Sequence, residues 1–344
     1  MDIRSTRLPA VTRRLFMKAG AATLALPALG KQAFAQDKFV MKIAHTEGIG
    51  TPITDAFDQW AAVLNERSGG RIDAQHFPAA QLGGLAEALE GSRIGTIQVT
   101  TAGPDSEEAI APEIAALGGA PGFIYKSEEH VDAVLQGELG QKASDIARAK
   151  TGVEFVAYGE TGFRHILADS PITSLEALRG VKIRVPQLNI WVSFWELLGA
   201  APTPLPYDQQ YEALSTGLID AIDSDVFSVE GFKFYEQAKH LTLTGHWFLP
   251  KAVRVNAAWL DSLPQDLQDL VRGSAKEVFA EQRATNRANA AATLETLKGH
   301  GVEVTQLPAE ELAKMEAQTA PLFDEFGSKS PETAEMIAAI RALA

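Results

Sequence analysis

Three acidic side chains stand close together in one short stretch of the sequence, at Asp220, Asp223 and Asp225. Carboxylate oxygens are the ligands that Ca²⁺ and Mg²⁺ prefer, so this cluster could hold a cation. Asp223 could instead accept hydrogen bonds from the hydroxyl groups of a polar ligand. A solvated or helix-capping group of acids explains the same residues equally well, and the sequence leaves these interpretations open.

Large aromatic side chains form a second group of candidates. Most such residues pack in a core, but one or two could form the wall of a ligand pocket. The group comprises Trp191, Phe194, Trp195, Phe227 and Trp247, of which we take Trp191, Phe227 and Trp247 as candidate pocket residues.

The motifs of several enzyme classes are missing. Gly48-x-Gly50 lacks the third glycine of a dinucleotide fingerprint, because Ile53 occupies its place. The sequence contains no phosphate-binding Gly-Lys-Ser/Thr loop, no Gly-x-Ser-x-Gly elbow and no cysteine, and its histidines do not fall at metal-ligand spacing. We therefore predict a protein that is not an enzyme and has no cofactor.

Segments with strand and helix patterns alternate along the chain and must position these residues. Strands are predicted at 39–45, 71–77, 96–101 and 153–159, and after Phe163 at 165–167, 182–185 and 219–222. A long strand-like run, 246–255, has room to cross between two lobes, and 264–298 reads as a long helix. The pattern predicts an α/β fold of two lobes with a hinged cleft, lobe I being 36–161 plus 250–289 and lobe II 162–249 plus 290–344.

The N-terminal 35 residues have the order of an export signal. Arg13-Arg14 precedes a mildly apolar run, and Ala33-Phe34-Ala35 forms a small-x-small cleavage site, which predicts a twin-arginine-type signal and a mature start at Gln36. The net charge of -13 and the scattered basic residues argue against a nucleic-acid partner. Without a cysteine there is no lipid anchor, so the sequence predicts a freely diffusing periplasmic protein.

A series of short motifs closely resembles the solute-binding proteins of tripartite ATP-independent periplasmic (TRAP) transporters, over nearly the whole mature chain. The most specific are the Lys-Ile-Arg-Val-Pro segment 182–186 and the downstream Ala-Leu-Ser-Thr-Gly-Leu-Ile-Asp segment 213–220. Further matches are Gly-Phe-Arg-His at 162–165, Lys-Ile-Ala-His at 42–45 and Pro-Ala-Ala-Gln-Leu-Gly at 78–83. The resemblance implies two α/β lobes that close over a ligand, a long hinge helix, and delivery to a membrane permease.

The resemblance also implies roles for individual residues. Arg184 would grip the ligand carboxylate, since a planar guanidinium pairs with a carboxylate at two points, and Arg164 matches a second arginine near that group. The alternative for either arginine is an ion pair with an acid of its own lobe. Gln187 matches a frequent pocket position, and Thr46 and Glu47 would face the cleft from the other lobe.

Some positions depart from the family pattern and bear on the ligand. Ser224 stands where many members have an asparagine, Asp223 where they have a glutamate, and Gln209 replaces another common glutamate. The polar set Asp223, Ser224 and Gln187 favours a hydroxylated or sugar acid, whereas an aromatic or plain monocarboxylic acid would suit the aromatic residues. A periplasmic enzyme that is exported folded, and a sensor subunit, are the alternative functions. We expect a monomer, because each two-lobe binding protein must open, and dock on the permease, by itself.

Overall fold

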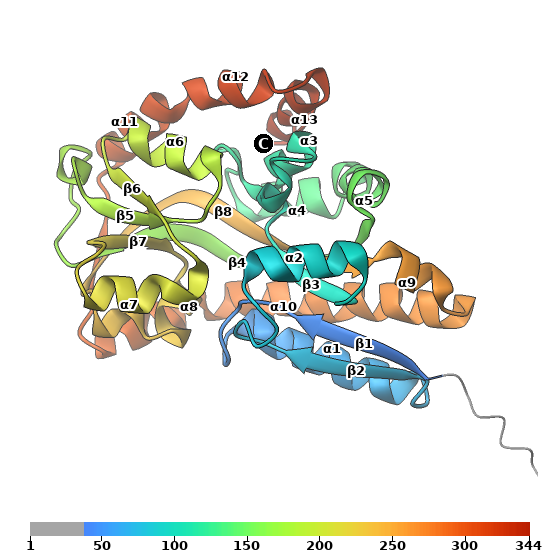
Figure 1. Cartoon of the computed structure of the whole chain (residues 1–344). Coiled ribbons are helices and arrows are strands. Elements are labelled where there is room, and N and C mark those ends of the chain that lie inside the picture. The colour runs from blue at the N-terminus through green and yellow to red at the C-terminus, as the bar shows by residue number, and fades with distance from the viewer. Residues whose placement is uncertain (1–37) are drawn as a thin grey trace, which may run out of the picture. The chain divides into compact units, whose positions relative to one another are not determined.

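One mixed β-sheet runs through the part of the chain that the computed structural model describes, residues 38–344 (Figure 1). Along it the strands follow the order β2-β1-β3-β8-β4-β7-β5-β6, and β9 pairs with β8. The predicted export signal, residues 1–35, lies outside the described residues. The strands are β1 (Phe39–Ala44), β2 (Ile72–Phe77), β3 (Val99–Ala102), β4 (Val153–Ala168), β5 (Lys182–Val185), β6 (Ala201–Pro204), β7 (Ala221–Ser224), β8 (His240–Asn256) and β9 (Glu303–Gln306).

Two long antiparallel strands, β4 and β8, join the two lobes. They pair from Val153 opposite Asn256 to Ala168 opposite His240. Strands β1 to β3 extend the sheet from one end of this pair, and β5 to β7 extend it from the other. Three register shifts interrupt the β4–β8 ladder, and such bulges bend a strand and increase its twist. The predicted two-lobe α/β fold is confirmed.

The separate strands predicted at 153–159 and 165–167 were wrong, because β4 is continuous. Gly159 stays in the ladder opposite Lys251, and a bulge follows between Glu160 and Gly162, opposite Pro250 and Leu249. Gly162 has a φ of +92°, a conformation that glycine adopts without strain. The long strand predicted at 246–255 begins earlier, at His240.

Helices cover the sheet and connect its strands. The longer ones are α1 (Pro52–Arg67), α2 (Leu85–Ile94), α4 (Glu128–Leu135), α5 (Glu138–Thr151), α6 (Asn189–Leu197), α10 (Gln265–Gly299), α11 (Ala309–Thr319) and α13 (Pro331–Arg341). Shorter ones are α3 (Pro112–Ala115), α7 (Gln210–Ser215), α8 (Val226–Gly231), α9 (Ala257–Ser262) and α12 (Pro321–Gly327). Between residues 38 and 344, none is both long and apolar enough to cross a membrane.

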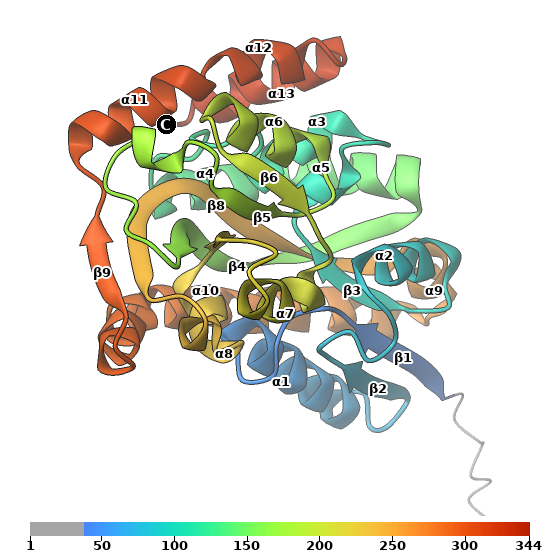
Figure 2. The same cartoon turned by 60° about the vertical axis from the view of Figure 1, so that its left-hand side comes forward.

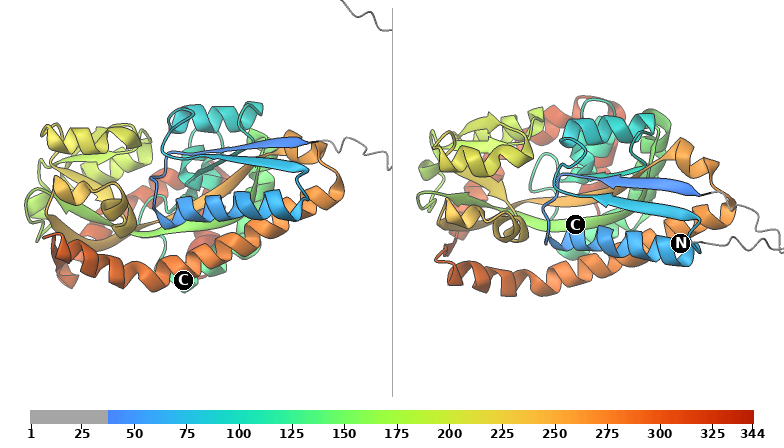
Figure 3. Two further views of the ribbon diagram at one scale, coloured as in Figure 1. Left: turned by 90° about the horizontal axis from the view of Figure 1, so that it is seen from below. Right: turned by 60° about the horizontal axis from the view of Figure 1, so that its bottom comes forward.

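The predicted long helix is α10, which runs along one side of both lobes (Figure 3). Its partner in the first lobe is α1, which starts with Pro52 in the first turn and buries Phe57, Trp60 and Leu64 on one face. The Trp60 indole N–H donates to Ser274 Oγ of α10 at 2.9 Å. A contact of this kind fixes α10 to one lobe, while its later turns pack near α8 and β9 of the other.

The C-terminal helices α11 to α13 lie along the opposite side of the molecule (Figures 1 and 2). Helices α11 and α12 pack on α6, whereas α13 packs on α3 and α5. His130 of α4 contacts the carbonyl oxygen of Ile340 in α13 at 2.7 Å. The C-terminal segment therefore contacts elements from both halves of the chain, and the predicted lobe boundaries stay a prediction.

Candidate ligand-binding cavity

A cavity of about 530 Å³ lies between the two lobes. Its walls are the segments that follow β1, β3, β5 and β6, the start of α2, and side chains from β4 and β8. In open α/β sheets, ligands bind outside the carboxyl ends of the parallel strands, and this cavity has that position in both lobes. The polar side chains that line it are Thr46, Glu47, Glu87, Thr101, Asp105, Ser106, Arg164, Arg184, Gln187, Tyr207, Asp208, Gln209 and Lys251.

Arg184 is the buried cation at the end of β5. Its Nε and Nη2 both donate to the carbonyl oxygen of Leu205, at 3.0 and 2.7 Å, and its guanidinium carbon lies 5.4 Å from the centre of the Tyr207 ring. No acidic side chain within residues 38–344 forms an ion pair with it. Burial, and then the charge of Arg164, lower its pKa to about 10, so it stays charged at neutral pH. A buried charge of this kind needs an anionic partner.

Arg164 has a different environment, because acids of its own lobe hold it. Its Nε forms an ion pair with Asp223, its Nη2 donates to the Asp223 carbonyl oxygen, and Asp225 lies 3.9 Å from Nη1. Its guanidinium also lies over the Trp191 ring, 5.3 Å from the ring centre. The structure thus has Arg164 lining the cavity and pairing with acids at the same time.

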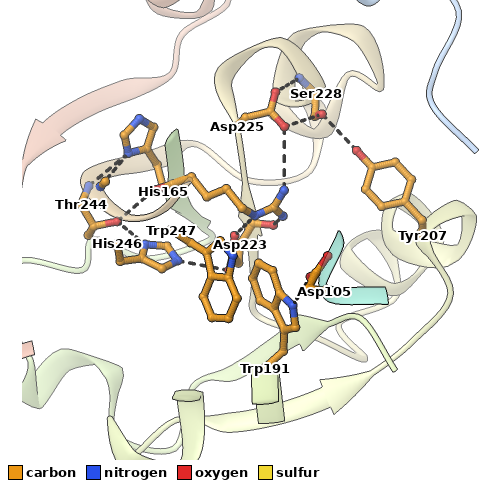
Figure 4. A network of polar contacts seen from close by, with 12 residues as sticks. Asp105, His165, Trp191, Tyr207, Asp223, Asp225, Ser228, Thr244, His246 and Trp247 are labelled. Carbon is orange, nitrogen blue, oxygen red and sulfur yellow. Dashed lines mark hydrogen bonds and ion pairs between the residues drawn. The ribbon is translucent and has the colours of Figure 1, made fainter. Parts of the chain in front are cut away.

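Asp223 lies at the centre of a hydrogen-bonded chain behind Arg164 (Figure 4). Its second oxygen is 3.1 Å from His246 Nε2, and His246 Nδ1 is 2.6 Å from the Thr244 hydroxyl. Because a carboxylate only accepts, the Nε2 of His246 carries a proton and donates it to Asp223. Burial acts to raise the pKa of Asp223, but Arg164 and His246 outweigh it and hold that pKa below its usual value.

Asp225 caps a helix. Its carboxylate accepts from the backbone N–H and the hydroxyl of Ser228, at 2.9 and 2.8 Å, and the Tyr207 hydroxyl lies 3.0 Å from the same Ser228 oxygen. Asp220 pairs with Lys182 at 3.0 Å. Within residues 38–344, no group of three or more suitable side chains could hold a metal ion. The helix-capping interpretation therefore fits Asp225, and internal ion pairs account for Asp220 and Asp223.

The wall of the first lobe carries more carboxylates than cations. Glu47 pairs with Lys251 at 2.7 Å, and both side chains are largely buried. Asp105 accepts a hydrogen bond from the Trp191 indole N–H at 2.8 Å, and burial raises its pKa to about 6 although this bond opposes the shift. Glu87 lines the same wall without a cationic partner in the described part of the chain.

Six of the ten residues predicted for the site line the cavity: Thr46, Glu47, Arg164, Arg184, Gln187 and Trp191. Four do not, namely Asp223, Ser224, Phe227 and Trp247. Asp223 and Ser224 are 1% exposed and lie behind Arg164. Trp247 stacks on Trp191 with ring centres 3.8 Å apart and donates to the Gly118 carbonyl oxygen. Phe227 lies at a different pocket. A direct contact of these four with the ligand stays a prediction that this geometry does not support.

The sequence analysis missed several polar cavity residues, among them Asp105, Tyr207 and Lys251. Lys251 gave a signal, because it interrupts the apolar run 247–253, where a buried lysine requires a partner such as Glu47. Asp105 follows a strand and the pair Gly103-Pro104, the position of a polar loop at a strand end. Tyr207 follows Pro206 after a four-residue strand and had no distinguishing pattern.

Asp105 gives a prediction on pH. Its folded pKa of about 6 lies above the unfolded value near 3.9, so the folded state binds a proton that the unfolded state has lost. This contribution to stability therefore falls as the pH rises from about 4 to about 6, by about 3 kcal/mol in total. Asp105→Asn keeps the shape and the acceptor for Trp191 but removes the titration. The difference in unfolding free energy between the variant and the wild type should grow across this window, measured by urea denaturation. A pH-independent difference would contradict the assignment.

The family model of bacterial extracellular solute-binding proteins, family 7, matches residues 43–330. This chain belongs to that family. A relative from Rhodobacter capsulatus, the C4-dicarboxylate-binding periplasmic protein DctP, is 29% identical over 348 residues, which cover 96% of this chain and 98% of the relative. The prediction of a TRAP-type solute-binding protein is confirmed. Membership of this family also indicates that the protein acts in the periplasm.

Two solved structures share the fold over most of the chain. The sugar acid binding protein from Advenella mimigardefordensis, in complex with galactonate, is 27% identical with a TM-score of 0.84, covering 90% of this chain and 99% of that one. A TRAP periplasmic solute-binding protein from Xanthobacter autotrophicus, with bound β-D-galacturonate, is 29% identical with a TM-score of 0.82, covering 88% and 99%.

Proposed function

We propose that this solute-binding protein captures a sugar acid with a single carboxylate, an aldonate or a uronate, and hands it to a membrane permease without catalysing a reaction. It is exported by the twin-arginine route and acts as a monomer. Arg184 carries this proposal, as a buried and charged guanidinium at the cavity without a carboxylate partner in residues 38–344. A ligand carboxylate would satisfy that charge through charge-assisted hydrogen bonds.

The first-lobe wall supports a ligand with only one carboxylate. Glu47, Glu87 and Asp105 line it, and Lys251 is already paired with Glu47. A second ligand carboxylate would meet like charges there, whereas sugar hydroxyls can donate to these oxygens. The galactonate and galacturonate bound by the two solved relatives combine one carboxylate with several hydroxyls. We therefore favour a sugar acid over a C4-dicarboxylate for this chain.

An aromatic acid is the weaker candidate. Trp247 stacks on one face of Trp191, and the Arg164 guanidinium lies over the same ring. Little aromatic surface is left for a ligand ring to stack on. Phe227 and Trp247 do not line the cavity, so the aromatic residues that would favour such a ligand do not gather at it.

Calorimetric titration of the mature protein tests the proposed ligand class. Galactonate and galacturonate should bind at least about a hundredfold more tightly than galactose, which lacks the charge, and than succinate, which has two carboxylates. Mass spectrometry of the released ligand should recover it unchanged. Tighter binding of succinate or of galactose would overturn the proposed ligand class, and chemical conversion of the ligand would overturn the non-enzymatic role.

A further inference from the structure

Two glycines lie where the two lobes touch outside the ligand cavity. Gly48 follows β1 of the first lobe, and Gly231 ends α8 of the second lobe, beside the start of α1 (Figure 2). A side chain at Gly48 would place its Cβ 2.7 Å from Cε2 and Cζ of Phe232, and one at Gly231 would place its Cβ 2.8 Å from Cγ2 of Thr51. Carbon atoms in contact prefer about 3.5–4.0 Å. Each lobe therefore has a glycine at the place where it receives a side chain of the other.

The backbone conformation does not require a glycine at either position. Both Gly48 and Gly231 lie outside the left-handed region, unlike Gly50, whose φ is +81°. Alanine would fit the backbone at both positions and would lose less conformational entropy on folding. The structure therefore gives one reason for these two glycines, which is the space that a side chain of the other lobe occupies.

The Phe232 ring, which packs on Gly48, is held on its other sides by aromatic neighbours. Tyr207 meets it edge to face with ring centres 5.1 Å apart, and Phe234 stacks on it with ring centres 5.4 Å apart. The Tyr207 ring in turn lies under the Arg184 guanidinium, at 5.4 Å. A chain of packed side chains thus runs from the first lobe through Phe232 and Tyr207 to Arg184.

We propose that Phe232 is a positioning residue for ligand capture, which packs on Gly48 when the lobes close and thereby holds Tyr207 against Arg184. Phe232 does not line the cavity, so it acts through Tyr207 without touching the ligand. Its contact with Gly48 joins the two lobes, so it stabilises the closed form and raises the apparent affinity for the ligand. The effect on affinity rests on the proposed function, whereas the contact between the lobes does not.

A double-mutant cycle tests this role by calorimetric titration with galactonate. Gly48→Ala should weaken binding by roughly tenfold, because the added methyl group displaces the Phe232 ring. Phe232→Ala should also weaken binding, because it removes the contact from the other side. In the Phe232→Ala background, Gly48→Ala should have no further effect, since no ring is left to displace. A general loss of structure at either residue would not produce this dependence of one change on the other.

Gly273→Ala is the matched control for the added methyl group. Gly273 lies on the exposed side of α10, also outside the left-handed region, and no atom lies within 4 Å of the place that its Cβ would take. This variant should bind galactonate as the wild type does. If Gly48→Ala also binds as the wild type does, or if its effect and that of Phe232→Ala simply add, Phe232 does not position the site through Gly48.

A disulfide tests the contact between the lobes without any ligand. The chain has no cysteine, so Thr51→Cys with Gly231→Cys introduces a single pair. Oxidation of the purified mature protein should cross-link these two positions, measured by loss of free thiol, and more slowly when Gly48→Ala is added. No cross-link, or an equal rate in the Gly48→Ala background, overturns the inference. If the cross-link forms as expected but galactonate does not bind the wild type, the proposed ligand class fails and the contact stands.

Discussion

Arg184→Ala should weaken sugar-acid binding by about 2–5 kcal/mol, which is roughly 30-fold to several-thousand-fold in Kd. The guanidinium is buried, is not ion-paired within residues 38–344, and makes its hydrogen bonds to a single carbonyl oxygen. The variant would leave the ligand carboxylate desolvated without its partner. Calorimetric titration with galactonate measures the loss directly.

Three comparisons make this result specific to the ligand. Arg184→Lys should also bind more weakly, because a single ammonium group cannot reproduce the two-point contact. Arg179→Ala removes a surface arginine of the same lobe, whose pair with Glu176 is about three-quarters exposed, and should leave the affinity unchanged. The unliganded Arg184→Ala protein should melt no lower than the wild type, because a buried cation without an ion-pair partner is itself costly. If Arg184→Ala binds galactonate with unchanged affinity, Arg184 does not bind the ligand carboxylate.

Asp223→Asn should destabilise the fold by about 3–5 kcal/mol, because it leaves Arg164 as a buried cation without its nearest carboxylate. The variant keeps the shape of the side chain, so the effect reports the charge. The pKa of Asp223 is held below its usual value, so this contribution is present above the unfolded pKa near 3.9 and is lost as the pH falls further. Urea denaturation at pH 7 and in acid measures both effects.

Asp220→Asn is the matched control for that experiment. Asp220 also pairs with a cation, but its side chain and that of Lys182 are 30% and 45% exposed, so its loss should cost less than about 1 kcal/mol. The double variant Arg164→Met with Asp223→Leu should recover much of the stability, since replacing a whole buried pair by apolar residues is often neutral. If Asp223→Asn is no more destabilising than Asp220→Asn, the buried network does not hold this part of the fold.

Sequence periodicity indicates the elements that bury one clear face. The first helix was readable from Ile53, Phe57, Trp60 and Leu64, and the long helix from its length. The continuity of β4 was not readable, because glycines at 159 and 162 look alike in a turn and in a bulge. Only the partner strand β8, which lies far along the chain, decides between them.

The site shows the same division between local and long-range information. Arg184 could be placed near a strand end from its motif alone, whereas Arg164 lies within the continuous strand β4. The position of Asp223 depends on its contacts with His246 and Arg164, and that of Trp247 on its contacts with Trp191 and Gly118. No local sequence pattern specifies these tertiary partners. Lys251 could have been predicted as a buried site residue, because its neighbours in the sequence are apolar.

The shared strands β4 and β8 have a consequence for how the chain acquires its structure. Val153 pairs with Asn256 and Ala168 with His240, so every rung of this ladder joins residues that are distant in sequence. In the first lobe, β3 pairs with β1 but lacks its second partner until β8 has been synthesised. Pairings over such distances are slow to form, because a long loop must close before the contacts stabilise it. Neither lobe can complete its sheet early, so the two halves gain their structure late and together, as one cooperative unit.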